Sequence, residues 1–209
     1  MLFRSTKCDH VLFGNYKQTA AGTDSTLIEW VKLGTAGTAA SGSVASGTSV
    51  QTLISLQGLD AVQWNANNSD GNDWSGTCNI RSWCDSFYSS AFNATQQAAI
   101  AQTSLTTKSY DEASSVTTTD KVFLLSYDEV KTMTDRICIP TAFALTTNTN
   151  SKNACYQDSS TKGCDWWLRS PGNYSGRAAS VYTGGDVIAN GHRASNTDGA
   201  ARPVLNLLT

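Results

Sequence analysis

Asp165-Trp166-Trp167-Leu168-Arg169-Ser170-Pro171-Gly172 is the stretch of this chain that decides its fold. The residues after it are mostly Gly, Ser, Ala, Asn, Tyr, Asp, His and Arg, and the chain closes with Ala201-Arg202-Pro203-Val204-Leu205-Asn206-Leu207. An aromatic strand and an apolar strand therefore bracket a polar stretch that could change without unfolding the domain. Binding surfaces are commonly built in this way, as variable side chains on a rigid scaffold.

Composition sets the first limits on fold and partners. The chain has 209 residues, a formal net charge of −2 and 40% hydrophobic residues. This predicts one globular domain over residues 1–209. The chain has no excess of basic residues that would attract nucleic acid or an anionic membrane, so neither is expected as a partner.

The N-terminal segment and the hydropathy pattern concern localisation. Residues 1–10 lack the apolar run of a signal peptide, and no segment approaches the length of a transmembrane helix. We expect synthesis in the cytoplasm and no membrane insertion. Any export would use another route, such as association with a phage particle or with the host cell.

Apolar periodicity and capping sequences predict the helices. Residues 80–91 carry one apolar stripe at helical spacing, formed by Ile80, Trp83, Cys84, Phe87, Tyr88 and Ala91. Ser126 and Glu129 form a capping-box sequence, which predicts that a helix starts after Ser126. Shorter helical segments are expected over residues 95–100 and 140–145.

The remaining apolar runs predict short strands. They cover residues 11–16, 27–33, 50–56, 121–125, 165–169, 178–182, 186–190 and 202–207. Residues 183–185, Thr-Gly-Gly, fit a tight hairpin turn. Residues 34–48 are almost entirely Gly, Ala, Ser and Thr, which indicates a long loop. Together these elements predict an α+β fold with short, mostly antiparallel strands and two to three helices.

The six cysteines do not form a zinc motif, because no pair has Cys-x-x-Cys spacing. Cys155 and Cys164 flank a polar loop and would pair if the protein reached an oxidising compartment. The alternative is that the cysteines are buried free thiols, as in a cytosolic protein.

Catalytic and metal motifs are weak. The two histidines, His10 and His192, lie in different regions, and no Gly-x-Ser-x-Gly elbow is present. Residues 68–73 are rich in side-chain oxygens but lack the closing Glu of an EF-hand, so a solvated turn is expected there. We therefore expect no enzyme, no catalytic residues, no metal and no cofactor.

Several blocks of sequence occur in the order typical of one family. The chain resembles bacterial and phage domains of unknown function that carry a WWLRSPG signature, here residues 166–172, and end in an RPAL-like strand. The weaker blocks are residues 13–16, 28–31, 80–83 and 120–126. The strand near Val50 departs from the pattern, because Thr52, Ser55 and Gln57 interrupt its apolar run.

Several proteins of this kind resemble the variable proteins of diversity-generating retroelements. That resemblance implies a C-type-lectin-like fold and a hypervariable region, here residues 165–209, that binds a protein or cell-surface ligand. Such systems mutate template adenines, typically in Asn codons, which cannot yield Lys, Glu, Gln, Met or Trp. None of these five residue types occurs between Pro171 and Thr209. A Gly- and Ser-rich surface loop would also lack them.

The resemblance further implies that exposed side chains between the bracketing strands form the binding surface. Tyr offers contact area at low entropic cost and Asn, Ser and Asp offer adaptable hydrogen bonds, while His192 and Arg193 would anchor an acidic or aromatic group. The predicted contact residues are Asn173, Tyr174, Ser175, Tyr182, Asp186, Ile188, Asn190, His192, Arg193, Asn196, Thr197 and Asp198.

Four distinctive residues are predicted to be structural. Trp166 and Trp167 are adjacent in a strand and face opposite sides, so at most one should lie in the main core, and the other could line a pocket. Arg169 and Arg202 are expected to bond loop carbonyls.

Two other functions stay open from the sequence. One is an invariant structural or cell-surface interaction module. The other is a calcium-dependent sugar-binding domain, although the Glu-Pro-Asn and Trp-Asn-Asp triplets of such lectins are absent.

Overall fold

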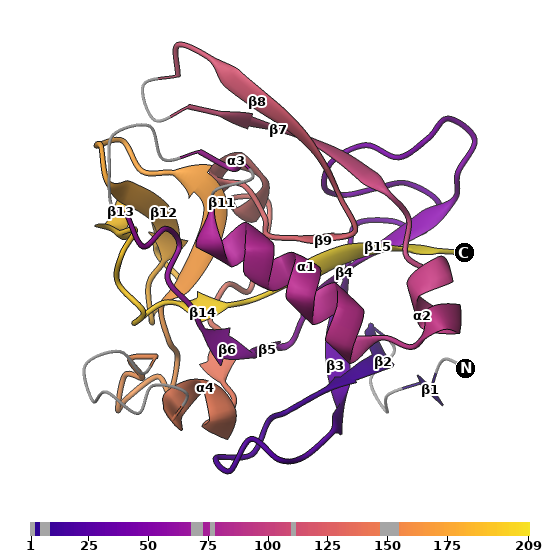
Figure 1. Cartoon of the computed structure of the whole chain (residues 1–209), viewed down its shortest axis with the longest axis horizontal. Coiled ribbons are helices and arrows are strands. Elements are labelled where there is room, and N and C mark those ends of the chain that lie inside the picture. The colour runs from indigo at the N-terminus through magenta and orange to yellow at the C-terminus, as the bar shows by residue number, and fades with distance from the viewer. Residues whose placement is uncertain (1–2, 5–8, 68–72, 76–77, 110–111, 147–154) are drawn as a thin grey trace.

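A computed structural model describes residues 3–4, 9–67, 73–75, 78–109, 112–146 and 155–209 (Figure 1). The described residues form an α+β structure of short, mostly antiparallel strands, as expected. They contain four helices, so the expectation of two to three was too low. The fourth comes from the segment around residue 140, where only a helical turn had been expected.

The main sheet has six strands, and the C-terminal strand lies inside it. β15 pairs antiparallel with β4 on one side and with β9 on the other, so it is an interior strand of this sheet. In spatial order the strands are β1 (Phe3–Arg4), β2 (His10–Tyr16), β3 (Thr26–Leu33), β4 (Val50–Ser55), β15 (Val204–Leu208) and β9 (Val122–Phe123).

The second sheet has five strands and carries the predicted variable region. Its order is β13 (Val187–Arg193), β12 (Arg177–Val181), β11 (Trp166–Pro171), β14 (Ala200–Ala201) and β6 (Asp60–Ala61). β13 is therefore an edge strand and β11 is central. Two smaller sheets pair β5 (Gln57–Gly58) with β10 (Ile139–Pro140), and β7 (Thr103–Lys108) with β8 (Ser115–Asp120).

The helices follow the sequence signals closely. They are α1 (Asn79–Ala91), α2 (Ala94–Ala98), α3 (Tyr127–Val130) and α4 (Ala142–Thr146). α1 buries Ile80, Cys84, Phe87 and Ala91, which confirms the predicted stripe. α3 begins with the capping box of Ser126 and Glu129, as predicted. No helix in the described residues is long and apolar enough to cross a membrane.

The β7–β8 hairpin was not predicted. Its strands are rich in Thr and Ser and contain few apolar residues, so no strong alternation of hydrophobicity marks them. Thr103, Leu105 and Thr107 nevertheless alternate as the buried residues of β7. In Figure 1 this ribbon stands above the end of the molecule that contains β11–β13.

The polar residues that interrupt β4 are satisfied inside the main sheet. Thr52 Oγ1 donates to Asn206 Oδ1 at 2.5 Å, and Asn206 Nδ2 donates to Thr103 Oγ1 at 3.0 Å. These residues are fully buried. Buried polar groups are tolerated where each finds a partner, so β4 needs no continuous apolar run.

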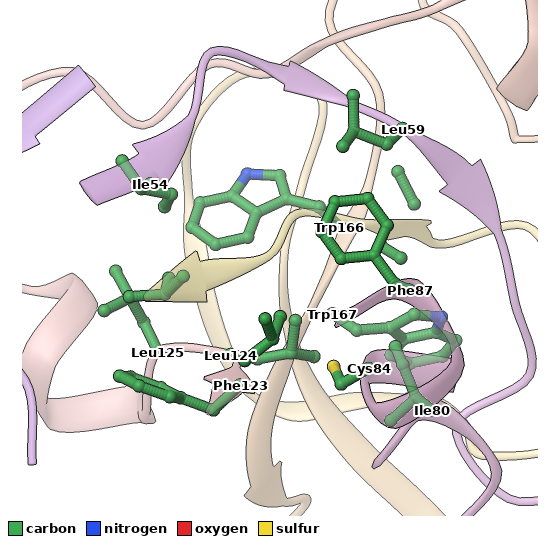
Figure 2. Packing of buried hydrophobic residues seen from close by; sticks show 14 of the residues in the cluster. Ile54, Leu59, Ile80, Cys84, Phe87, Phe123, Leu124, Leu125, Trp166 and Trp167 are labelled. Carbon is green, nitrogen blue, oxygen red and sulfur yellow. The ribbon is translucent and has the colours of Figure 1, made fainter. Parts of the chain in front are cut away.

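Both Trp166 and Trp167 are fully buried in the core, so the expectation that at most one of them would lie there was wrong. The reason is that both faces of β11 are covered. Trp166 Nε1 donates to Arg136 O at 3.0 Å on one face, and Trp167 Nε1 donates to Val62 O at 2.8 Å on the other. Figure 2 shows the two indoles in the core, Trp166 towards Ile54 and Trp167 towards α1.

The two arginines of the signature strands do bond backbone carbonyls. Arg169 Nη1 donates to Leu124 O at 2.9 Å, and Arg202 Nε donates to Ser55 O at 3.0 Å. Arg169 also forms a bidentate pair with Glu129, in which Nη2 lies 2.7 Å from Oε1. This pair ties β11 to the capping box of α3, and the sequence did not reveal it.

Candidate functional site

The predicted contact residues divide by exposure into three groups. Seven are exposed and define what we call the ribbon surface: Asn173, Tyr174, Ser175, Tyr182, Asp186, Asn190 and Arg193. Four are partly buried: Ile188, His192, Asn196 and Asp198. The expectation of an exposed side chain is wrong for Thr197, which is 8% exposed.

The ribbon surface is built on the hairpin of β12 and β13. Val181 pairs with Val187 at one end and Arg177 pairs with Arg193 at the other, and the register shifts between them. Gly191 lies in this irregular part of β13 with φ of 55°, and a Cβ there would lie 1.5 Å from Ala178 O. Only glycine therefore permits this close approach of β13 to β12.

Turns at both ends of the hairpin hold the exposed side chains. The predicted turn at residues 183–185 is confirmed by Tyr182 N donating to Asp186 O at 2.9 Å and Gly185 N donating to Tyr182 O at 2.8 Å. At the other end, Asn173 N donates to Ala189 O at 3.1 Å. Both turns are thus tied to the scaffold by backbone bonds, whichever side chains they carry.

Beneath the ribbon surface the scaffold is apolar and closely packed. Ala178, Ala179 and Val181 of β12 are buried, as are both tryptophans of β11. By contrast, Tyr174 is 61% exposed and Tyr182 is 37% exposed. Large aromatic groups at the surface of a rigid sheet are typical of protein-binding surfaces.

His192 supports the ribbon rather than projecting from it. Its Nε2 lies 3.0 Å from Asp165 Oδ2, and its ring contacts those of Tyr182 and Trp167 at centroid distances of 4.9 and 6.0 Å. Pairing with Asp165 raises the pKa of His192, and partial burial opposes that shift. Asp165 Oδ1 also accepts from Thr183 N at 2.9 Å, so one carboxylate fixes both β13 and the turn.

The loop of residues 194–199 is folded inward, which explains the burial of Thr197. Ser195 O accepts from Gln63 Nε2 at 2.6 Å, and Asp198 O accepts from Tyr156 N at 3.2 Å. Gly199 lies against the indole of Trp167, where a Cβ would come within 2.5 Å of the ring. This loop covers the core, and only part of it is available to a ligand.

A groove of about 270 Å³ borders the ribbon surface at Asn173. It lies between the β7–β8 hairpin and the start of α3, with Ala179 and Ala189 also lining it. Its polar lining includes Thr107, Lys108, Ser126, Tyr127 and Ser170. Sequence reasoning missed these residues because they come from three separate segments and carry no shared motif.

Tyr156 is a second surface residue that the sequence did not indicate. It is 58% exposed and hydrogen-bonds through its backbone to Asp198, one of the predicted contact residues. It precedes the signature strand, outside residues 165–209. A ligand on that side of the ribbon surface would therefore meet a residue from outside the predicted variable region.

The described residues contain no group of three or more His, Cys, Asp or Glu side chains placed to hold a metal ion. Most of the oxygen-rich loop considered for calcium, residues 68–72, lies outside the described part of the chain. The two histidines are engaged separately, because His10 Nδ1 lies 2.6 Å from Glu29 Oε1 and His192 pairs with Asp165.

Comparison with known proteins places the chain in a family without assigning an activity. No curated protein and no solved structure matches it. One family model, a domain of unknown function, matches residues 48–209 and so includes both the WWLRSPG block and the C-terminal strand. This match covers most of the chain and both strands that bracket the polar stretch, so the protein belongs to the DUF6273 family.

Proposed function

We propose that the protein is a ligand-binding variable protein with a C-type-lectin-like fold, diversified at its C-terminus by a retroelement. Its partner would be a protein or another cell-surface ligand, and its chemistry would be binding rather than catalysis. The observation that carries the proposal is the ribbon surface itself: seven predicted contact residues are exposed along an edge hairpin whose underlying side chains are buried.

The arrangement separates positions that can change from positions that cannot. The ribbon surface stands on turns held by backbone hydrogen bonds, so substituting its side chains removes little structure. The neighbouring tryptophans, alanines and valines are enclosed on both sides of the sheet. The absence of Lys, Glu, Gln, Met and Trp from Pro171 to Thr209 supports adenine-directed change of the same segment.

The chemistry of the ribbon surface favours a protein partner. Tyr174 and Tyr182 offer aromatic contact area, Asn173 and Asn190 offer amide hydrogen bonds, and Arg193 offers a cation to an acidic group. A surface of mixed aromatic and neutral polar groups suits a polar, hydrated interface better than a purely electrostatic one.

Sequencing the DNA around the coding region tests the proposal directly. We expect a reverse-transcriptase gene and a near-copy of the segment encoding residues 165–209 that differs only where the copy has adenine. The differing codons should fall on the ribbon surface and the partly buried positions around it. Trp166, Trp167, Ala178 and Ala179 should be unchanged.

Two results would overturn the proposal. The absence of both genetic elements would leave an invariant interaction module, and the ribbon surface would then be an ordinary protein surface. Differences concentrated at buried positions would mean that variation does not serve binding.

A further inference from the structure

Three cysteines from separate segments meet beneath the start of β11. Cys138 directly precedes β10, Cys164 lies two residues before β11, and Cys155 begins the segment that leads to it. All three are buried, and both of the other cysteines influence the pKa of the Cys164 thiol. We propose that Cys138 and Cys164 are a modification site that forms a disulfide bond in an oxidising environment.

The backbone already holds Cys138 and Cys164 at a suitable distance. Cys164 N donates to Cys138 O at 2.8 Å. Disulfides join residues whose α-carbons are about 4.4–6.8 Å apart, and two residues joined by a backbone hydrogen bond lie close enough to be candidates. We therefore expect the bond to form mainly by rotation of the two side chains.

The two sulfur atoms also occupy one confined space. A Cβ added to Gly58 would lie 3.4 Å from Cys138 Sγ and 3.5 Å from Cys164 Sγ. The same Cβ would approach Ala200 to within 2.6 Å. Gly58 thus leaves room for both sulfurs on one side of β5.

Cys155 is less well placed to be the partner of Cys164. In the short antiparallel bridge of this region, the residue opposite Cys164 is Gln157. Cys155 is two residues further along, and such diagonal neighbours have α-carbons about 7–8 Å apart. In a regular ladder that separation is at or beyond the limit for a disulfide, and Cys155 Sγ donates to Asp165 O at 3.9 Å, so we expect Cys155 to remain a thiol.

Arg202 supplies a positive charge beside the pair. Burial raises the pKa of the Cys138 thiol, and the guanidinium of Arg202 acts in the opposite direction. Among the described residues, Arg202 Nη1 is buried without a hydrogen-bond partner. A thiolate formed during exchange would give this cation a neighbouring anion, which partly offsets the cost of burying the thiolate.

The oxidant would be a low-molecular-weight disulfide, such as that of a glutathione-class thiol. One cysteine thiolate attacks a sulfur of the small disulfide and forms a mixed disulfide, and the released thiolate takes up the proton. The second cysteine then displaces the remaining small thiol. Two protein S–H bonds and one small S–S bond are exchanged for one protein S–S bond and two small thiols.

The disulfide would stabilise the segment around Asp165 that supports the ribbon surface. It would close the loop between β10 and β11, next to Asp165, which holds both the 183–185 turn and His192. Closing a long loop restricts the unfolded chain and thereby stabilises the folded one. This inference does not depend on the identity of any ligand.

Refolding the chain with reduced and oxidised glutathione tests the inference. Remaining thiols would be alkylated, and the disulfide-linked peptides would be identified by mass spectrometry. We expect a peptide pair linking Cys138 to Cys164, both in the unsubstituted chain and in Cys155→Ala. The urea midpoint should be higher for the oxidised than for the reduced form of these two proteins.

Cys138→Ala serves as the matched variant, in which the urea midpoint should no longer depend on the redox buffer. A Cys155–Cys164 link in the unsubstituted chain would overturn the inference. So would a folded protein, shown by its near-ultraviolet circular dichroism, that carries no disulfide after oxidation.

Discussion

At the scale of single residues, the pair of Arg169 and Glu129 is the most consequential contact that the sequence did not reveal. Arg169 is 3% exposed, and burial tends to raise the pKa of Glu129. The hydrogen bonds and positive charge of Arg169, together with hydrogen bonds from Ser126 and Ser41, outweigh that effect, so the pKa of Glu129 lies below its ordinary value. The carboxylate is therefore charged and partly buried, and Arg169 is its counter-ion.

Removing Arg169 should be strongly destabilising. Arg169→Met would leave the partly buried Glu129 carboxylate without its counter-ion, which should cost up to about 3–5 kcal/mol. Urea unfolding measures this loss. The control is Lys131→Ala, which removes an exposed ion pair with Asp128 and should leave the midpoint unchanged. Equal effects of the two substitutions would contradict the assigned role of the buried pair.

The same pair predicts a loss of stability in acid. Because the pKa of Glu129 is lower in the folded state, its contribution is present above the ordinary glutamate pKa and is lost as the pH falls through the folded-state value. Measured against Glu129→Gln, the advantage of the unsubstituted chain should shrink in acid. An advantage that did not change with pH would contradict the lowered pKa.

His192 predicts a dependence of the opposite sign. Pairing with Asp165 raises its folded-state pKa, with Asp198 adding to the shift and partial burial and Arg177 opposing it. The stabilisation is therefore complete below the unfolded-state pKa and is lost as the pH rises through the folded-state value. Relative to His192→Gln, the unsubstituted chain should be more stable in urea unfolding below the ordinary histidine pKa, and this advantage should disappear as the pH rises through the folded-state value.

At the scale of elements, the β12–β13 hairpin depends on Gly191, whose role the sequence pattern of β13 does not predict. Gly191→Ala would place a methyl group against Ala178 O and strain the positive φ, so we expect a loss of about 2 kcal/mol or more. Gly184 is the matched control, since a Cβ there would have no neighbour within 4 Å. Comparable unfolding midpoints for the two variants would show that the hairpin can relax.

Elements with strong local signals formed as predicted, and those without such signals were missed. The stripe of α1 and the capping box of α3 are local, because the residues that define each lie within a few turns of one another. The β7–β8 hairpin has weak strand signals of its own. Its buried face is defined by contacts with β11 and with Asn206, which lie far away in sequence.

At the scale of the whole molecule, the proposed function requires that surface and scaffold be separable. Replacing Tyr174, Tyr182, Asn190 and Arg193 together by Ala should change the unfolding free energy by only about 0.5 kcal/mol per site. Trp167→Ala should cost about 3–5 kcal/mol, because its indole is enclosed in the core. Thermal unfolding of both variants gives the comparison. Unfolding of the quadruple variant would identify the ribbon surface as scaffold.

The sequence by itself determined the α+β class, the principal helix, most of the strands, the capping box and the position of the hairpin turn at residues 183–185. These features arise from periodicity, capping and turn chemistry, which act between residues close in the chain. Most of the predicted contact residues proved to be exposed for the same reason, since they are polar residues in turns and on an edge strand.

Only the tertiary structure decided which side chains are enclosed. It buried both Trp166 and Trp167 because β11 became the central strand of a sheet covered on two faces. It buried Thr197 by folding the 194–199 loop inward, brought Arg169 to Glu129, and gathered Cys138, Cys155 and Cys164 into one cluster. Each of these outcomes depends on the packing of segments distant in sequence, which periodicity and local propensity do not specify.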